Sequence, residues 1–155
     1  MILADLKHYT LVTGSGEGST TLNAFDQALL NSGVGNTNLV KLSSILPPNL
    51  SERQRADLAL APGSLLPIAF GHICSEVEGQ TISAGVGIGI IPGSYGVIVE
   101  ASGAMPGKAL ELRLQRMVGE ALANRRVTGA EVRVDVSEHR VRQRGCAFAG
   151  VALWG

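Results

Sequence analysis

Two segments of the chain carry hydrophobic residues at the spacing of an amphipathic helix. Within residues 106–124 the apolar positions are Leu110, Leu114, Met117, Val118, Ala121 and Leu122. Within the segment LNAFDQALL they are Leu22, Phe25, Ala28 and Leu29. Ser19-Thr20-Thr21 provides N-caps for this earlier helix, and Ser32-Gly33 provides an end for it. The pattern therefore predicts two main helices.

Apolar runs of strand length fill most of the remaining chain. They cover residues 9–13, 38–42, 65–74, 80–92, 95–101 and 146–154, while residues 130–139 alternate valine with charged residues. The glycine-rich residues 14–18 predict a loop, and the charged stretch 49–64 predicts an exposed loop with one helical turn at most. We expect one domain, residues 1–155, of the α/β class in its α+β form, with mostly antiparallel strands.

Composition and charge exclude several classes of protein. Hydrophobic residues make up 45% of the 155 residues and charged residues 17%, which is incompatible with a disordered chain. The formal net charge is zero, so neither nucleic acid nor an anionic membrane is expected as a partner. The chain shows no signal peptide and no apolar run of 18 residues, which predicts a soluble, cytoplasmic protein.

The two cysteines do not form a recognisable motif. Cys74 and Cys146 lie 72 positions apart with no CxxC or Cys/His spacing, so we expect neither a zinc site nor a disulfide framework.

Glycine is unusually abundant, with 20 residues. The segment GSGEG at 14–18 lacks the spacing of a phosphate-binding loop and predicts a tight turn from strand to helix. Gly85, Gly87 and Gly89 alternate with apolar residues, which leaves one face of a strand bare. Either another layer or subunit packs closely on that face, or a ligand contacts it.

Few residues suggest chemistry on spacing alone. The three histidines share no motif, which favours structural roles. Glu100 ends an apolar run, and is either the point where a strand meets water or a carboxylic acid with a raised pKa. Asp26 lies within an apolar helix and is either exposed or placed to meet a cation. Ser43-Ser44 before Pro47-Pro48 predicts a turn.

Longer segments resemble a known family. GSGEGSTTLNAFDQALLNSGVGNTNLVKLSSILPP, LPIAFGHICSEVEGQTISAGVGIGI, VIVE and SEHRVRQRGCAFAGVALW are closely similar to the pyruvoyl-dependent arginine decarboxylases, over about residues 10 to 154. The resemblance implies an αββα sandwich, two β-layers flanked by helices. It also implies a homotrimer, sometimes paired into a hexamer, with the active site between neighbours.

The resemblance implies a cofactor made from the chain itself. The Ser44 hydroxyl would attack the Ser43 carbonyl to form an ester, and elimination would cut the chain into residues 1–43 and 44–155. The new N-terminus would carry a covalent pyruvoyl group from Ser44. Its ketone would form a Schiff base with L-arginine and yield agmatine and CO2, with no pyridoxal phosphate and no metal. Agmatine would then serve either polyamine biosynthesis or acid resistance.

The family's other functional residues map onto single positions of this sequence. Glu100 matches the proton donor, and Asn38 matches the residue that positions the cleavage site and the pyruvoyl group. Asp26 matches the carboxylate that binds the substrate guanidinium. The stem of the substrate would lie against Phe25, Leu29 and Ile45.

Two other interpretations stay open at this stage. The first is a pyruvoyl-dependent decarboxylase of another amino acid. The second is a non-catalytic trimeric ligand-binding protein of the same fold, which predicts an uncut chain without a new carbonyl group.

Overall fold

The computed structural model describes residues 5–155, and they form one domain with two helices and two packed β-sheets. The helices are α1 (Thr21–Ser32) and α2 (Gly107–Asn124), with a short 3-10 turn, η1 (Arg55–Asp57). The strands are β1 (His8–Glu17), β2 (Asn38–Lys41), β3 (Ile45–Leu46), β4 (Ser51–Glu52), β5 (Leu65–Ser75), β6 (Thr81–Ile90), β7 (Gly96–Gly103), β8 (Glu131–Arg140) and β9 (Gly145–Trp154). This confirms the single α+β domain.

The strands divide into a five-stranded and a four-stranded sheet. The first has the order β2-β5-β9-β1-β4 and the second β3-β7-β6-β8. Most pairs are antiparallel, and the parallel pairs are β1 with β4 and β2 with β5. Every residue of β9, at the centre of the larger sheet, is buried. The main core lies between the sheets, where β5 and β9 face β6.

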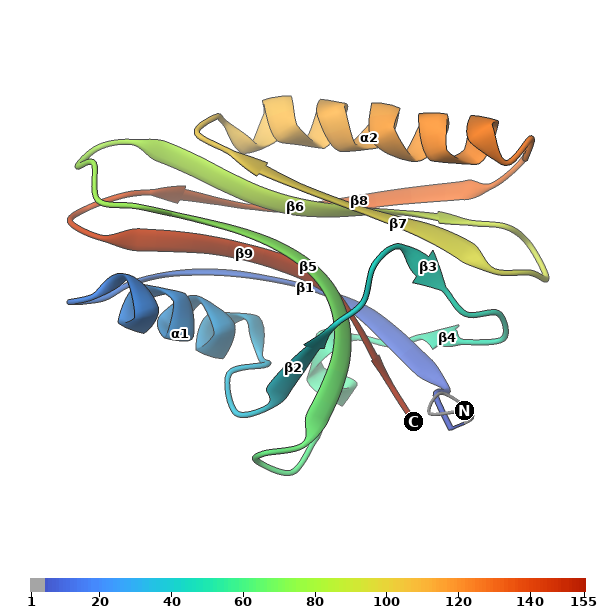
Figure 1. Cartoon of the computed structure of the whole chain (residues 1–155), viewed down its shortest axis with the longest axis horizontal. Coiled ribbons are helices and arrows are strands. Elements are labelled where there is room, and N and C mark those ends of the chain that lie inside the picture. Colours follow the sequence, from blue (N-terminus) through green and yellow to red (C-terminus); the bar gives the residue numbers. More distant parts are fainter. Residues whose placement is uncertain (1–4) are drawn as a thin grey trace.

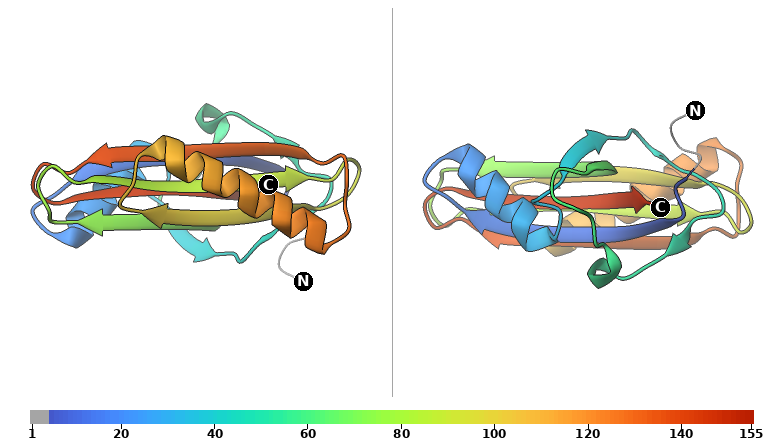
Figure 2. Two further views of the ribbon diagram at one scale, coloured as in Figure 1. Left: turned by 90° about the horizontal axis from the view of Figure 1, so that it is seen from above. Right: turned by 90° about the horizontal axis from the view of Figure 1, so that it is seen from below.

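Each helix covers the outer face of one sheet. Figure 1 shows α2 above the four-stranded sheet and α1 below the five-stranded sheet. In Figure 2, α2 runs diagonally across its sheet, whereas α1 lies over one end of the other sheet. The predicted caps are confirmed for α1, because the Thr20 side chain accepts from the Asn23 N–H and Gly33 ends the helix at φ 91°.

Glycine-bearing strands allow both helices to approach closely. A Cβ on Gly85 would lie 2.5 Å from Leu114, and one on Gly87 would lie 2.8 Å from Val118. The bare face of β6 is therefore occupied by α2 of the same chain, which confirms the interpretation that another layer packs on it.

The loop prediction for residues 14–18 is wrong over most of its length. Residues 14–17 continue β1, which pairs with β9 as far as Glu17↔Gly145. The glycines of this stretch, like those of β6, leave room for a helix to lie close to the strand. A Cβ on Gly14 would lie 2.6 Å from the backbone oxygen of Ala28 in α1, and a Cβ on Gly18 would lie within van der Waals overlap of the Ala24 nitrogen. Sequence reasoning mistook the glycines needed for a close helix-sheet contact for the glycines of a turn.

The expectation that the cysteines do not form a disulfide is also wrong. Cys74 of β5 and Cys146 of β9 are directly opposite in the antiparallel register, with their Cα atoms 4.1 Å apart, and form a disulfide. Spacing along the chain could not show this, because the pairing depends on how two distant strands align. The bridge lies under α1, with the Cys146 sulfur 3.7 Å from the Thr21 oxygen.

Two of the histidines have polar partners that fit structural roles. His139 Nε2 lies 2.5 Å from Glu17 Oε2, and the backbone N–H groups of residues 142–144 donate to the other oxygen of Glu17. Burial alone would raise the pKa of Glu17, but these hydrogen bonds lower it to about 2. His8 Nδ1 lies 2.9 Å from the Ser51 hydroxyl and joins β1 to β4.

Candidate functional site

Ser43 and Ser44 lie in the segment that crosses from one sheet to the other. β2 ends at Lys41 in the five-stranded sheet, and β3 begins at Ile45 in the four-stranded sheet. The Leu42 N–H donates to the Ile68 oxygen at 2.9 Å, and the Ser44 oxygen accepts from the Ile98 N–H at 2.7 Å. This segment is therefore anchored to both sheets, close to the peptide bond between the two serines.

An open pocket lies beside this peptide bond. Its volume is about 580 Å³, and it is lined by Lys41, Leu42, Ser43, Ser44, Val99, Glu100 and Met117. The wall combines apolar side chains with two hydroxyls, one carboxyl and one ammonium group. The structure thus brings three of the predicted site residues, Ser43, Ser44 and Glu100, to one cavity.

Glu100 is held in a half-buried position in β7. Opposite it, β5 carries Gly71, where an added Cβ would lie 3.3 Å from the Glu100 Cβ. This close backbone packing removes water from the carboxyl group, and burial raises its pKa, while the charge of Lys41 partly lowers it. A carboxyl group with a raised pKa is suited to donate a proton near neutral pH.

Lys41 and Met117 line the pocket but were not predicted as site residues. The Lys41 ammonium also lies 4.8 Å from the centre of the Phe70 ring. Phe70 continues into an aromatic cluster, because the His72 ring lies 6.1 Å from Phe70 and 4.8 Å from Phe25. Lys41 is one of only three lysines in the chain and lies two positions before Ser43. This position was the only feature of the sequence that could have marked Lys41 as a site residue.

Asn38 lies at the other end of β2 from the two serines. Its side-chain amide donates to the Gly63 oxygen at 2.9 Å, and its N–H donates to the Ser64 oxygen at 2.8 Å. In the structure, which describes residues 5–155, Asn38 does not line the pocket.

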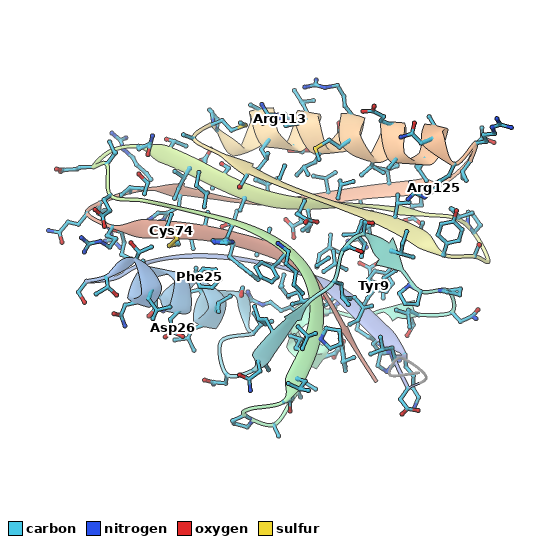
Figure 3. The ribbon with its side chains drawn as sticks, in the orientation of Figure 1. Tyr9, Phe25, Asp26, Cys74, Arg113 and Arg125 are labelled. Atoms are coloured by element: carbon cyan, nitrogen blue, oxygen red, sulfur yellow. A yellow bond between two sulfur atoms is a disulfide. The ribbon has the colours of Figure 1, made fainter. Side chains whose placement is uncertain are left out.

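The predicted substrate-binding residues of α1 also lie away from this pocket. Asp26 is on the exposed side of the helix, facing away from the sheets (Figure 3). Phe25 and Leu29 pack partly buried against the five-stranded sheet. Ile45 directly follows Ser44 in β3, pairs with Val97, and is 42% exposed. The predicted site residues therefore lie in two separate places. The substrate-binding residues of α1 are in one place, and the two serines with Ile45 are in the other.

The pocket has the groups for two kinds of chemistry. A serine hydroxyl next to a peptide carbonyl allows an acyl group to move from nitrogen to oxygen. A half-buried carboxyl group with a raised pKa allows a proton to be delivered to an acceptor in the cavity.

The chain is similar to known proteins along almost its whole length. The family model for pyruvoyl-dependent arginine decarboxylase matches residues 8–153. The pyruvoyl-dependent arginine decarboxylase of Methanocaldococcus jannaschii is 42% identical over 148 residues, covering 94% of this chain and 88% of its own. Those of Thermococcus sibiricus and Pyrococcus furiosus are 40% and 37% identical, covering 95% and 96% of this chain and 94% and 95% of their own. The chain belongs to the pyruvoyl-dependent arginine decarboxylase family.

Proposed function

We propose that this chain cuts itself between Ser43 and Ser44 and decarboxylates L-arginine to agmatine and CO2. The observation that carries the proposal is that the Ser43–Ser44 peptide and Glu100 share one open pocket. The Ser44 hydroxyl attacks the Ser43 carbonyl, and the chain separates into residues 1–43 and 44–155. The proposal requires neither pyridoxal phosphate nor a metal.

The residues around Ser44 fit a pyruvoyl group at that position. When present, the group supplies a ketone that accepts the substrate amine and draws off electrons as CO2 leaves. Glu100, whose pKa is raised by burial, donates the proton that replaces CO2 on the substrate α-carbon. Val99 and Met117 keep this wall of the pocket apolar.

We further propose that the site is completed by a neighbouring protomer in a homotrimer, which can pair into a hexamer. Within one protomer, no residue of α1 lines the Ser44 pocket, yet α1 carries the exposed carboxylate that suits a guanidinium. Asp26, Phe25 and Leu29 of one protomer then bind arginine at the Ser44 of another. Asn38 has its positioning role in the same assembled site. The order helix, sheet, sheet, helix supports the αββα sandwich of this proposal.

The surface around β2 supports a contact between subunits. β2 is an edge strand of the larger sheet; Val40 in β2 and Leu65 in the neighbouring β5 are 43% and 72% exposed. An apolar pocket of about 560 Å³ extends from this edge across β5 to β9, and its lining includes Val40, Pro67 and Trp154. An unpaired strand edge next to exposed apolar side chains is a typical contact surface.

Replacing Asp26 by alanine is expected to raise the KM for arginine by about tenfold to a hundredfold, since a charge-assisted hydrogen bond contributes about 1.5–3 kcal/mol. Self-cleavage should continue at the wild-type rate. Steady-state kinetics and intact mass measure the two effects. Glu120→Ala, which removes an exposed carboxylate from α2, serves as the matched control. An unchanged KM would contradict the role of Asp26.

Mixing two variants with different defects tests whether the site is shared. Ser44→Ala protomers keep Asp26, and Asp26→Ala protomers keep Ser44, so a mixed trimer contains some complete sites. At an arginine concentration well below the raised KM of Asp26→Ala, we expect more activity than Asp26→Ala gives alone after the two variants are unfolded together and refolded, and we expect light scattering to give the mass of a trimer. Refolded mixtures with no gain over Asp26→Ala alone, or an active monomer, would contradict a shared site.

Replacing Lys41 by methionine is expected to move the alkaline limb of the kcat profile to higher pH. Lys41 lowers the pKa of Glu100, so the pKa rises further when the cation is removed. Glu100 acts when protonated, and activity is lost as the pH rises through its pKa; a higher pKa therefore extends activity upward. Lys108→Met on the exposed face of α2 is the control. A limb that stays in place or moves to lower pH would contradict this assignment.

A further inference from the structure

The backbone N–H of Ile98 is placed to act on Ser44 chemically as well as structurally. It donates to the Ser44 carbonyl oxygen at 2.7 Å, at the short end of the usual range for N–H···O bonds. This contact lies one residue beyond the two paired positions of β3 and β7, Ile45↔Val97 and Leu46↔Gly96. It therefore extends the strand pairing to the residue at which the chain is cut.

We propose that the Ile98 N–H stabilises the negative charge that develops on the Ser44 carbonyl oxygen during self-cleavage. The inference rests on the proposed function, since it concerns the step that separates residues 1–43 from 44–155. It assigns the Ile98 N–H to the elimination that follows ester formation.

The elimination requires the carbonyl of Ser44 to accept electrons. The Cα–H bond of Ser44 breaks, and its proton passes to hydroxide from the solvent that fills the open pocket. The electron pair forms the Cα–Cβ double bond, the bond between Cβ and the ester oxygen breaks, and Ser43 leaves as a carboxylate. As the proton departs, charge spreads onto the adjacent carbonyl oxygen, where a hydrogen-bond donor lowers the barrier.

The donor is rigid, which makes it effective. The Ile98 side chain is 1% exposed and belongs to the core between the two sheets. On its other side, β7 pairs with β6 over eight residues, including Ile98↔Ile88. A donor fixed in this way needs no rearrangement when charge appears on the oxygen.

Replacing the N–H with an oxygen atom tests this directly. Cell-free translation with the α-hydroxy acid analogue of isoleucine at position 98 turns one backbone amide into an ester of the same shape. Because N–H groups alternate sides along a strand, the same change at Val97, which pairs with Gly89 and does not line the pocket, removes a donor that faces β6, and this is the matched control. We expect self-cleavage to slow by about tenfold or more at position 98 and little at position 97.

Hydroxylamine distinguishes a blocked elimination from a failure to fold. A folded position-98 variant should still form the ester between Ser43 and Ser44, and hydroxylamine should cut it into a fragment ending at residue 43 and one with an amino-terminal serine. Mass separates these fragments from any cut at the introduced ester. Cleavage at the wild-type rate, or a slowed variant without this hydroxylamine-sensitive ester, would overturn the proposal. An uncut wild-type chain would instead contradict the proposed function.

A second measurement does not depend on cleavage rates. In the uncut Ser44→Ala chain labelled with ¹³C at the carbonyl of residue 44, the hydrogen bond should lower the infrared stretching frequency of that carbonyl relative to the same chain carrying the ester at position 98. Equal frequencies would show that the donor does not polarise the bond, and would overturn the proposal.

Discussion

Replacing Ser44 by alanine is expected to leave the chain as one uncut polypeptide with no arginine decarboxylase activity. Alanine lacks the hydroxyl that attacks the Ser43 carbonyl, so neither the ester nor a new N-terminus forms. Both sheets keep their contacts, because Ser44 contributes a backbone oxygen to the Ile98 hydrogen bond and alanine retains that oxygen. The loss should therefore be complete for cleavage and turnover, with thermal stability close to that of an uncut wild-type chain.

Denaturing gels and intact mass measure the cleavage, and release of labelled CO2 from arginine measures the turnover. Ser94→Ala, in the exposed turn between β6 and β7, is the matched control and should be cut normally. If the Ser44→Ala chain were still cut after residue 43, the nucleophile would have been misassigned.

Replacing Glu100 by glutamine is expected to separate cleavage from turnover. Glutamine is nearly the same size, so the packing against Gly71 remains and the chain should still be cut. It cannot donate a proton as a carboxylic acid does, and kcat should fall by about 10²–10⁴-fold. Intact mass would show both fragments, while CO2 release would show the loss of activity.

Glu120→Gln provides the control for Glu100, because it changes an exposed carboxylate on α2 in the same way. A Glu100→Gln enzyme with wild-type turnover would show that another group delivers the proton. An uncut Glu100→Gln chain would show that Glu100 acts during maturation instead.

The disulfide is not expected to join the two chains that cleavage produces. Cys74 and Cys146 both lie in residues 44–155, and residues 1–43 contain no cysteine. The small chain is held by other contacts: β1 pairs with β9 over ten residues, and α1 packs on β1 and β9. Native subunits should therefore stay assembled after reduction.

The helices and most strands could be predicted because their signals are local. The apolar stripe of residues 106–124 reflects a helix face turned toward a core, and the valine alternation of residues 130–139 reflects a strand on which Val134 and Val136 are half-buried. Gly14 and Gly16 were misassigned because the reason for glycine there is the backbone of α1, which no local pattern reveals.

The site was less predictable than the fold because it depends on contacts between residues that are distant in the sequence. Nothing in the spacing of Ser43 and Ser44 distinguishes a reactive peptide from a turn, and only resemblance to a family singled it out. The raised pKa of Glu100 depends on the backbone of β5 opposite it, and the place of Lys41 depends on where the edge strand β2 ends. These are properties of neighbours distant in sequence.

Intact mass under denaturing conditions, on freshly purified protein, tests the central claim most directly. The account predicts two species, residues 1–43 and residues 44–155, with the larger carrying a pyruvoyl group in place of Ser44 and lighter than the serine form by one ammonia. A single full-length species, or a large fragment that begins with an unmodified serine, would contradict it.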